Sequence, residues 1–332
     1  MAWLRPVTQS EFSIIDHFFK QGSVKRDDVA LGIGDDGAVT NIASGMQLVS
    51  AVDTLVSKIH FPGEARPYDI GYKSLAVNLS DLAAMGAEPA WATLAITMPE
   101  ADENWLQQFC DGFFNLAKEV HVQLIGGDTT QGPLTVTVQV MGVIPEGKAL
   151  TRGGAKKGDC IFVSGTLGDA ALGLAIYQQE QIGAEIAEGQ KTILLNKLNL
   201  PTPRLALGIA LRDIATAAID VSDGLAADLN HILQASHLGA TIDWQQIPLS
   251  PGMRAIKNIK RQYDFALGGG DDYELCFTAP ADQRHEVQRL AQQLSIMVTE
   301  IGAIEETSGL RLLDKGVTSE LANIGYQHFS KR

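Results

Sequence analysis

The sequence predicts a mixed α/β (α+β) protein of two domains. Short runs rich in β-branched and aromatic residues alternate with segments of helical periodicity, and this alternation is typical of folds in which helices cover sheets. The chain has 332 residues, more than the roughly 100–200 residues that one domain usually holds. Hydrophobic residues make up 45% of it, enough to form buried cores, which argues against an intrinsically disordered protein.

Strands and helices are predicted along the whole chain. Strands are expected where short apolar runs are bounded by Gly, Pro or Asp, at Gln47–Val52, Trp91–Thr97, Val122–Ile125, Leu134–Ile144, Cys160–Ser164, Ala217–Val221 and Tyr273–Thr278. Helices are expected where apolar residues recur at helical spacing, at Glu11–Phe19, Tyr68–Met85, Glu103–Glu119, Asp169–Gln181, Pro203–Asp213, Leu225–Ala235 and Asp282–Leu294. Proline suits the first turn of the fifth helix, because the N–H that it lacks would have no partner there.

The domain boundary is expected in Pro145–Gly158, where glycines and basic residues cluster between two predicted strands. This placement predicts an N-terminal domain at residues 1–148 and a C-terminal domain at residues 149–332. A surface loop within one domain would have a similar composition.

The charge and the cysteines limit the possible functions and locations. The formal net charge of −13 disfavours binding to nucleic acid or to an anionic membrane, since both require a positive surface. The three cysteines form no CxxC pair, which favours a reducing compartment. The N-terminal segment lacks the pattern of a signal peptide, and no uninterrupted apolar stretch is long enough to span a membrane. A cytoplasmic protein is therefore expected.

Asp recurs beside Gly, Ser or Thr in six short segments. They are GIGDDGA (Gly32–Ala38), VDTL (Val52–Leu55), NLSDLAAMGA (Asn78–Ala87), GGDTT (Gly126–Thr130), DVSDGL (Asp220–Leu225) and GGGDDYEL (Gly268–Leu275). Turns and helix caps explain any one such segment. Two of them, however, place Asp at the expected end of a strand beside open backbone N–H groups, which suits an anion or a hard cation. Asp81 lies within a helical pattern, where a carboxylate close to apolar positions destabilises the fold unless it is paired or bound to metal.

The motifs that are absent exclude several other enzyme classes. The chain has no GxxxxGK[ST] phosphate-binding loop, no HExxH or CxxC zinc motif and no GxSxG nucleophile elbow. The segment Ile161–Leu174 has a glycine-rich turn without GxGxxG, which is better explained as a packed turn than as a dinucleotide site. Oxygen ligands without Cys or His favour Mg²⁺, which proteins commonly hold by carboxylates together with substrate phosphates. Phosphoryl transfer is therefore the leading chemistry.

Seven segments in order resemble the thiamine-monophosphate kinases of the aminoimidazole-ribonucleotide synthetase-like superfamily. They are GIGDDGA, VDTL followed by His60, VNLSDLAAMGAEPAW, LIGGDTT, ALTRGGAKKGD, AIDVSDGLAADL and GGGDDYELCFT. The resemblance covers essentially the whole chain. It implies that ATP phosphorylates thiamine monophosphate directly, with Mg²⁺, to give thiamine diphosphate. It also implies a homodimer formed by an N-terminal α+β domain that binds ATP and Mg²⁺, followed by a C-terminal α/β domain.

The resemblance also implies roles for individual residues. The positions that match the family's magnesium ligands are Asp36, Asp53, Asp81, Asp128, Asp220 and Asp223. Those that match ATP contacts are Gly127, Asp128, Arg152 and Ser222, and those that match thiamine-phosphate contacts are His60, Asp271 and Tyr326. Four of these residues, Asp53, Asp128, Asp220 and Arg152, are expected to carry the catalysis.

Two departures from the family pattern affect these assignments. The hydroxylic residues that often precede the VDTL aspartate are Ala51 and Val52 here, so only their backbone carbonyls could bind metal. The family's Gly-Gly-Glu-Asp-Tyr reads Gly-Gly-Asp-Asp-Tyr, which makes the side chain of Asp271 one methylene shorter.

Two alternatives stay open from the sequence. One is another ATP-dependent enzyme of the same superfamily. Some of its members use a catalytic Cys or Lys near the N-terminus or a Cys at the C-terminus, and these residues have no counterpart here. The other is a non-catalytic regulatory dimer that binds Mg-nucleotide, against which the intact His60, Asp271 and Tyr326 argue.

The absence of a Ser/His/Asp or Cys/His constellation agrees with phosphoryl transfer, because a phosphate monoester with a second pKa of about 6 is already nucleophilic near pH 7.

Overall fold

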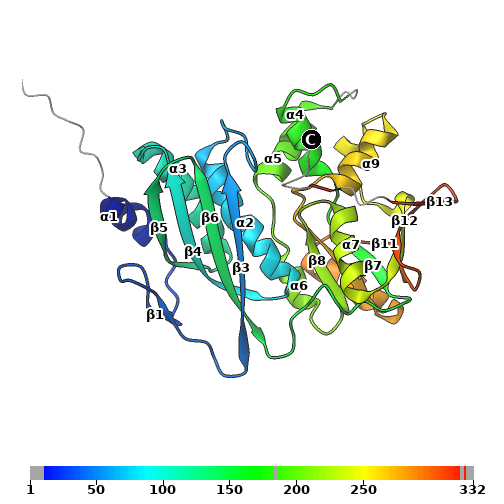
Figure 1. Ribbon diagram of the computed structural model, residues 1–332, viewed down its shortest axis with the longest axis horizontal. Helices are drawn as coiled ribbons and strands as arrows, with labels where there is room; N and C mark the ends of the chain where they lie inside the picture. The colour runs from blue at the N-terminus through cyan, green and yellow to red at the C-terminus, as the bar shows by residue number, and fades with distance from the viewer. Residues whose placement is uncertain (1–10, 183–185, 322–324, 327–332) are drawn as a thin grey trace, which may run out of the picture. The chain divides into compact units, whose positions relative to one another are not determined.

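The computed structural model describes residues 11–182, 186–321 and 325–326. The chain forms two compact units (Figure 1). Unit 1 contains Met1–Leu79 and Pro89–Val143, and unit 2 contains Ser80–Glu88 and Ile144–Arg332. The chain therefore contributes Ser80–Glu88, which includes Asp81, to the unit that the later residues build.

Unit 1 is built on a four-stranded sheet of order β3-β6-β4-β5. Its strands are β3 (Met46–Val56), β4 (Glu88–Met98), β5 (Gln123–Gln131) and β6 (Thr135–Pro145), and its helices are α2 (Pro67–Ala84) and α3 (Glu103–Glu119). The two helices pack closely, because a Cβ at Gly71 would lie 2.0 Å from the carbonyl oxygen of Phe109, and one at Gly112 would lie 1.9 Å from that of Tyr68. Glycine is thus required at both positions for this helix crossing.

The N-terminal part of unit 1 holds short elements. They are α1 (Glu11–Ile14), the π-helix η1 (Ile15–Lys20), β1 (Val29–Leu31) and β2 (Val39–Thr40). The helix predicted at Glu11–Phe19 is therefore present but changes to π-helical geometry at Ile15. β1 and β2 form a separate antiparallel pair.

Unit 2 is built on a seven-stranded sheet of order β13-β12-β9-β11-β7-β10-β8. Its strands are β7 (Cys160–Ser164), β8 (Ala217–Val221), β9 (Gly239–Asp243), β10 (Glu274–Ala279), β11 (Val298–Glu305), β12 (Gly309–Asp314) and β13 (Val317–Glu320). β12 pairs parallel with β9, whereas β10 pairs antiparallel with both β7 and β8. Every residue of β7, β8 and β10 is buried, which is why apolar residues dominate their sequences without alternating with polar ones.

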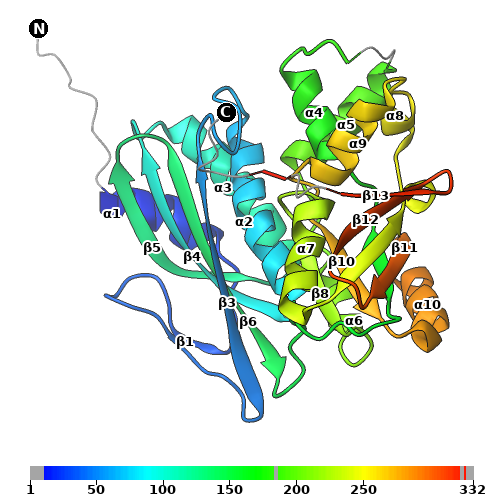
Figure 2. The same cartoon turned by 45° about the vertical axis from the view of Figure 1, so that its right-hand side comes forward.

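Helices cover both faces of this sheet (Figure 2). They are α4 (Asp169–Tyr177), α5 (Glu188–Asn199), α6 (Leu205–Ala210), α7 (Leu225–Ser236), α8 (Pro251–Arg254), α9 (Ile259–Gly268) and α10 (Arg284–Leu294), with 3₁₀ turns η2 (Trp244–Gln246) and η3 (Ala281–Gln283). One core joins Ile161 and Ile219 to Leu229 of α7. The other joins Phe162 and Phe277, whose rings stack 5.3 Å apart, to Leu207 of α6.

These two units confirm the predicted mixed α/β (α+β) class. No helix among the described residues is both long and apolar enough to cross a membrane. Several predicted ends were wrong. The helix predicted at Pro203–Asp213 is α6 (Leu205–Ala210), so its prolines precede the helix, and the strand predicted at Gln47–Val52 continues to Val56. Two further ends also differ. The helix expected to reach Gln181 stops at Tyr177, because Gln179 adopts a left-handed backbone (φ 55°). The strand expected to stop at Ile125 continues as β5 to Gln131.

Candidate functional site

Asp53 is held by a buried amide in unit 1. Its backbone N–H donates to Oδ1 of Asn78 at 2.8 Å, and Nδ2 of Asn78 donates to the carbonyl of Ser74 at 2.9 Å. A buried side chain whose donor and acceptor are both engaged has one defined orientation, so Asn78 ties β3 to α2 at Asp53. Of the two residues before Asp53, Ala51 is half-buried and Val52 is exposed. Sequence reasoning missed Asn78, although it begins the NLSD motif.

His60 has a defined tautomer. It follows β3, and its Nδ1 accepts the backbone N–H of Val56 at 2.9 Å. Because Nδ1 serves as the acceptor, the hydrogen of the neutral ring is on Nε2. His60 is half-buried, and its contact with Val56 gives it a local structural role.

Gly127 and Asp128 lie inside β5 and not at a strand end. Asp128 pairs with Ala95 of β4 in a parallel register that continues to Gln131. A Cβ at Gly127 would lie 1.8 Å from the carbonyl oxygen of Leu94, so only glycine permits this approach. The prediction that Asp128 stands at a strand tip was therefore wrong. β5 is an edge strand of the sheet, and Asp128 is exposed on it.

Asp36 lies on the exposed loop between β1 and β2. Its backbone N–H donates to Oδ1 of Asp35 at 2.9 Å, a typical turn contact of aspartate. Gly34, with φ 128°, allows the turn that precedes this pair. The predicted ligands of unit 1 thus lie on a loop (Asp36) and on the two edge strands (Asp53, Asp128).

In unit 2, Asp220 is buried near the end of β8. Its Oδ2 accepts the hydroxyl of Ser80 at 2.8 Å. Ser80 precedes Asp81 near the end of α2, and Asp81 is half-buried. The Ser-Asp pair of the NLSD motif and the first Asp of the DVSDG motif are therefore joined within unit 2. Sequence reasoning did not single out Ser80.

The turn after β8 is organised by Asp228. Oδ2 of this buried residue accepts the backbone N–H groups of Ser222 at 3.1 Å, Asp223 at 3.0 Å and Gly224 at 3.1 Å. The expectation that these N–H groups would be open to an anion was therefore wrong, because a carboxylate four residues into the sequence of α7 occupies them. Burial, followed by the negative charges of Asp220 and Asp223, raises the pKa of Asp228 to about 7. Three carboxyl groups, those of Asp220, Asp223 and Asp228, therefore interact at this turn.

The segment that leads into β10 lies against the same turn. The N–H of Asp271 donates to the carbonyl of Ser222 at 2.9 Å, and the N–H of Tyr326 donates to that of Asp223 at 3.1 Å. A Cβ at Gly270 would lie 2.5 Å from the carbonyl oxygen of Ser222, so glycine is required for this contact. The structure therefore brings Ser222, Asp223, Asp271 and Tyr326 together in unit 2.

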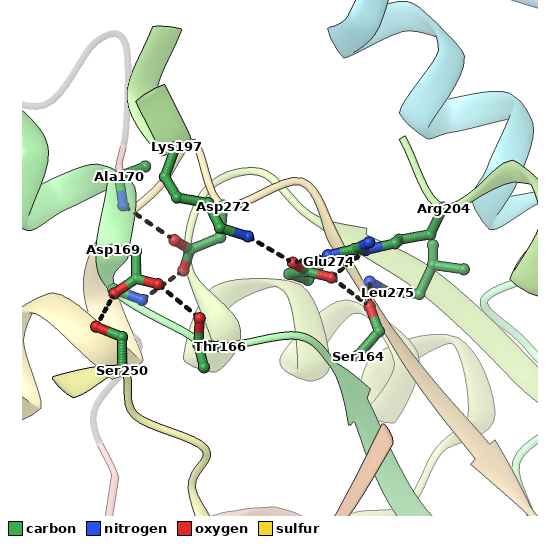
Figure 3. A network of polar contacts seen from close by, with 11 residues as sticks. Ser164, Thr166, Asp169, Ala170, Lys197, Arg204, Ser250, Asp272, Glu274 and Leu275 are labelled. Atoms are coloured by element: carbon green, nitrogen blue, oxygen red, sulfur yellow. Dashed lines mark hydrogen bonds and ion pairs between the residues drawn. The ribbon is translucent and has the colours of Figure 1, made fainter. Parts of the chain in front are cut away.

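Asp272 and Glu274, which continue this segment into β10, belong to a buried polar network (Figure 3). Asp272 accepts the N–H of Gly168 at 2.7 Å and that of Ala170 at 3.3 Å, so it caps the start of α4. Burial raises the pKa of Asp272 well above its usual range. Glu274 receives two hydrogen bonds from Arg204, both at 2.5 Å. The glycine turn before α4 is therefore a packed turn filled by the chain's own carboxylate, as its sequence indicated.

Arg152 and the predicted metal ligands do not form a single group among the described residues. Arg152 is exposed in the segment between β6 and β7. Within the described ranges, no three His, Cys, Asp or Glu side chains converge closely enough to form a metal site by themselves. The predicted carboxylates are therefore distributed over several elements in both units.

Both units match models of one protein class. Residues 34–144 match the N-terminal domain of AIR synthase related proteins, and residues 156–315 match their C-terminal domain. The fold and the sites thus define an AIR synthase related protein.

Individual relatives give a narrower assignment. Thiamine-monophosphate kinase of Escherichia coli (strain K12) is 47% identical over 322 residues, which cover 96% of this chain and 98% of that protein. The crystal structure of the Stenotrophomonas maltophilia K279a enzyme has 49% identity and a TM-score of 0.84, over 91% of this chain and 96% of that one. AaThiL complexed with AMPPCP and TMP has 28% identity and a TM-score of 0.76, over 98% of this chain and 99% of that one. The chain belongs to the thiamine-monophosphate kinase family.

Proposed function

We propose that this chain transfers the γ-phosphoryl group of ATP to the phosphate of thiamine monophosphate. A phosphate oxygen of the acceptor forms a bond to the γ-phosphorus, the bond from that phosphorus to the β-bridging oxygen breaks, and the products are thiamine diphosphate and ADP. The observation that carries this proposal is the full-length kinship to thiamine-monophosphate kinases at 47% identity. The similar structure of AaThiL, complexed with AMPPCP and TMP, further supports sites for a nucleotide and for thiamine monophosphate.

The acceptor needs no general base from the protein. Its second pKa of about 6 makes it largely dianionic near pH 7. The chain's task is therefore to position two anions and to stabilise their charge. We assign Gly127, Asp128, Arg152 and Ser222 to the nucleotide; the guanidinium of Arg152 suits a phosphate because its N–H groups form a planar fork.

The carboxylates present suit Mg²⁺. They offer hard oxygen donors, and Asp220 and Asp223 lie at one turn with Asp228, whose pKa is raised first by burial and then by these two charges. We assign Asp36, Asp53 and Asp128 in unit 1, and Asp81, Asp220 and Asp223 in unit 2, to holding several Mg²⁺ ions, with weaker roles for the backbone carbonyls of Ala51 and Val52. When bound, Mg²⁺ neutralises phosphate charge.

Three residues are assigned to thiamine monophosphate. His60 can donate from Nε2–H to the phosphate, because its Nδ1 is engaged with Val56. Asp271 is suited to the cationic ring of the substrate by its charge. The ring of Tyr326, which is 38% exposed beside Asp223, can contact the same cation through its face, an interaction of about 0.5–2 kcal/mol.

We also propose a cytoplasmic homodimer. The outward face of the unit 1 sheet exposes Leu48 (48%) and Val52 (58%) on β3, and an exposed apolar sheet face suits a second copy. All three cysteines are buried thiols, which is compatible with a reducing compartment. The acidic composition supports neither nucleic-acid nor membrane partners.

The direct experiment is to incubate the purified protein with Mg-ATP and thiamine monophosphate and to separate the products by chromatography. Equal amounts of thiamine diphosphate and ADP are expected. Nucleotide binding without any product would instead identify a regulatory Mg-nucleotide-binding protein.

A further inference from the structure

The segment Asp271–Tyr273 has an unusual backbone. Asp271 (φ 70°) and Tyr273 (φ 49°) are both in the left-handed region, which non-glycine residues seldom adopt and which is costly for a bulky side chain. Such a conformation persists only where the surroundings impose it. Three contacts do so here: the N–H of Asp271 donates to Ser222 at 2.9 Å, the N–H of Tyr273 donates to the carbonyl of Val221 at 2.8 Å, and Asp272 between them caps α4.

In this backbone conformation the side chain of Tyr273 lies against that of Asp271. The hydroxyl of Tyr273 donates to Oδ1 of Asp271 at 3.1 Å. Tyr273 is only 8% exposed, whereas Asp271 is half-buried at the end of the segment. The packed ring of Tyr273 therefore fixes the position of its hydroxyl, and the hydroxyl defines the orientation of the carboxylate.

We propose that Tyr273 is a positioning residue for thiamine monophosphate. Its hydroxyl holds the Asp271 carboxylate in the orientation that receives the cationic end of the substrate. This inference rests on the proposed function, in which Asp271 contacts that substrate. At 3.1 Å the hydrogen bond is long for a hydroxyl donor, so it acts by restricting the direction of the carboxylate.

The variant Tyr273→Phe tests this inference, because it removes the hydroxyl and keeps both the ring and the backbone hydrogen bonds. The KM for thiamine monophosphate is expected to rise roughly 3- to 10-fold, with less than a twofold change in kcat and in the KM for ATP. An unaltered KM for thiamine monophosphate, or equal increases in both KM values, would overturn the inference.

A matched control is Tyr263→Phe in the same unit. The hydroxyl of Tyr263 donates to Oδ2 of Asp314 at 2.7 Å, so this variant also removes a tyrosine-carboxylate hydrogen bond. It is expected to leave the KM for thiamine monophosphate within twofold of the original. If both variants raise this KM equally, the effect is one of general stability and the inference fails.

A double-mutant cycle shows whether Tyr273 acts through Asp271. In the Asp271→Asn background, Tyr273→Phe is expected to add less than a twofold change, because the carboxylate that it positions is gone. Independent, multiplying effects would overturn the inference.

Calorimetric binding of thiamine monophosphate to the same variants separates this result from the proposed reaction. Binding that weakens in Tyr273→Phe supports the inference even if no turnover occurs, whereas turnover failure alone contradicts the proposed function.

Discussion

At the residue scale, the site depends on side chains that hold the predicted ligands as much as on the ligands themselves. Asn78 binds the backbone at Asp53, and Ser80 binds the carboxylate of Asp220. Asp228 engages three successive N–H groups of the DVSDG turn. The motifs identified the ligand candidates because carboxylates beside glycine are visible in a sequence. They did not identify these supports, because a sequence does not show which donor meets which acceptor.

Asp53→Asn tests one assigned ligand at this scale. The substitution keeps the shape of the side chain and the backbone contact to Asn78, so the fold should be retained while turnover falls about 100-fold or more. Steady-state kinetics and circular dichroism check the two parts. Asp111→Asn on α3 is a control for loss of one negative charge in unit 1 and should leave turnover unchanged. Near-normal activity of Asp53→Asn would remove Asp53 from the mechanism.

At the scale of elements, apolar patterning predicted many of the elements that form the cores, but it missed β9, β11 and β12, whose Ile242, Ile304 and Leu312 are buried in unit 2. α3 runs from Glu103 to Glu119 as predicted, and β7 and β8 also have their predicted bounds. Patterning failed where tertiary contacts decide the conformation. β5 continues through Gly126 and Gly127, since pairing with β4 overrides the tendency of glycine to end a strand. The polar strand β13 was also missed, because all four of its residues are exposed.

Gly127→Ala tests the claim that close strand pairing requires this glycine. The new Cβ would lie 1.8 Å from the carbonyl oxygen of Leu94, so the strands must separate, at an expected cost of about 1–3 kcal/mol in the free energy of unfolding. Gly126→Ala is the matched control, because a Cβ there has no heavy atom within 4 Å. Urea denaturation of both variants measures the difference. Equal stabilities would contradict the account of β5.

The DVSDG turn also predicts how the protein responds to metal. Mg-ATP should raise the melting temperature by several degrees more than ATP with a chelator, because the carboxylates at this turn repel a bare polyphosphate. Thermal unfolding with matched ionic strength provides the comparison. Equal shifts would mean that the clustered aspartates do not serve as a metal site.

At the scale of the whole molecule, the net charge of −13 disfavours nucleic-acid and anionic-membrane partners. The structure shows where part of that charge lies: Asp220, Asp223 and Asp228 gather at one turn of unit 2. Composition describes the average surface, whereas binding depends on a few positions, so the charge alone could not predict a nucleotide enzyme.

The proposed homodimer belongs to this scale. Leu48→Glu places a charge on the exposed face of the unit 1 sheet and should convert the dimer to a monomer, because a buried unpaired carboxylate is costly. Ile193→Glu on α5 is the control, since both side chains are 48% exposed. Light scattering after size exclusion gives the masses. A monomeric parent protein, or a Leu48→Glu variant that still dimerises, would contradict the proposed interface.

The central claim is direct phosphoryl transfer from ATP to thiamine monophosphate, and following a labelled phosphate tests it most directly. With ATP labelled at the γ-phosphate, Mg²⁺ and thiamine monophosphate, the label should appear in thiamine diphosphate in a one-to-one ratio with ADP, and it should not appear when a chelator is present. Release of the label as inorganic phosphate, with thiamine monophosphate unchanged, would contradict the account.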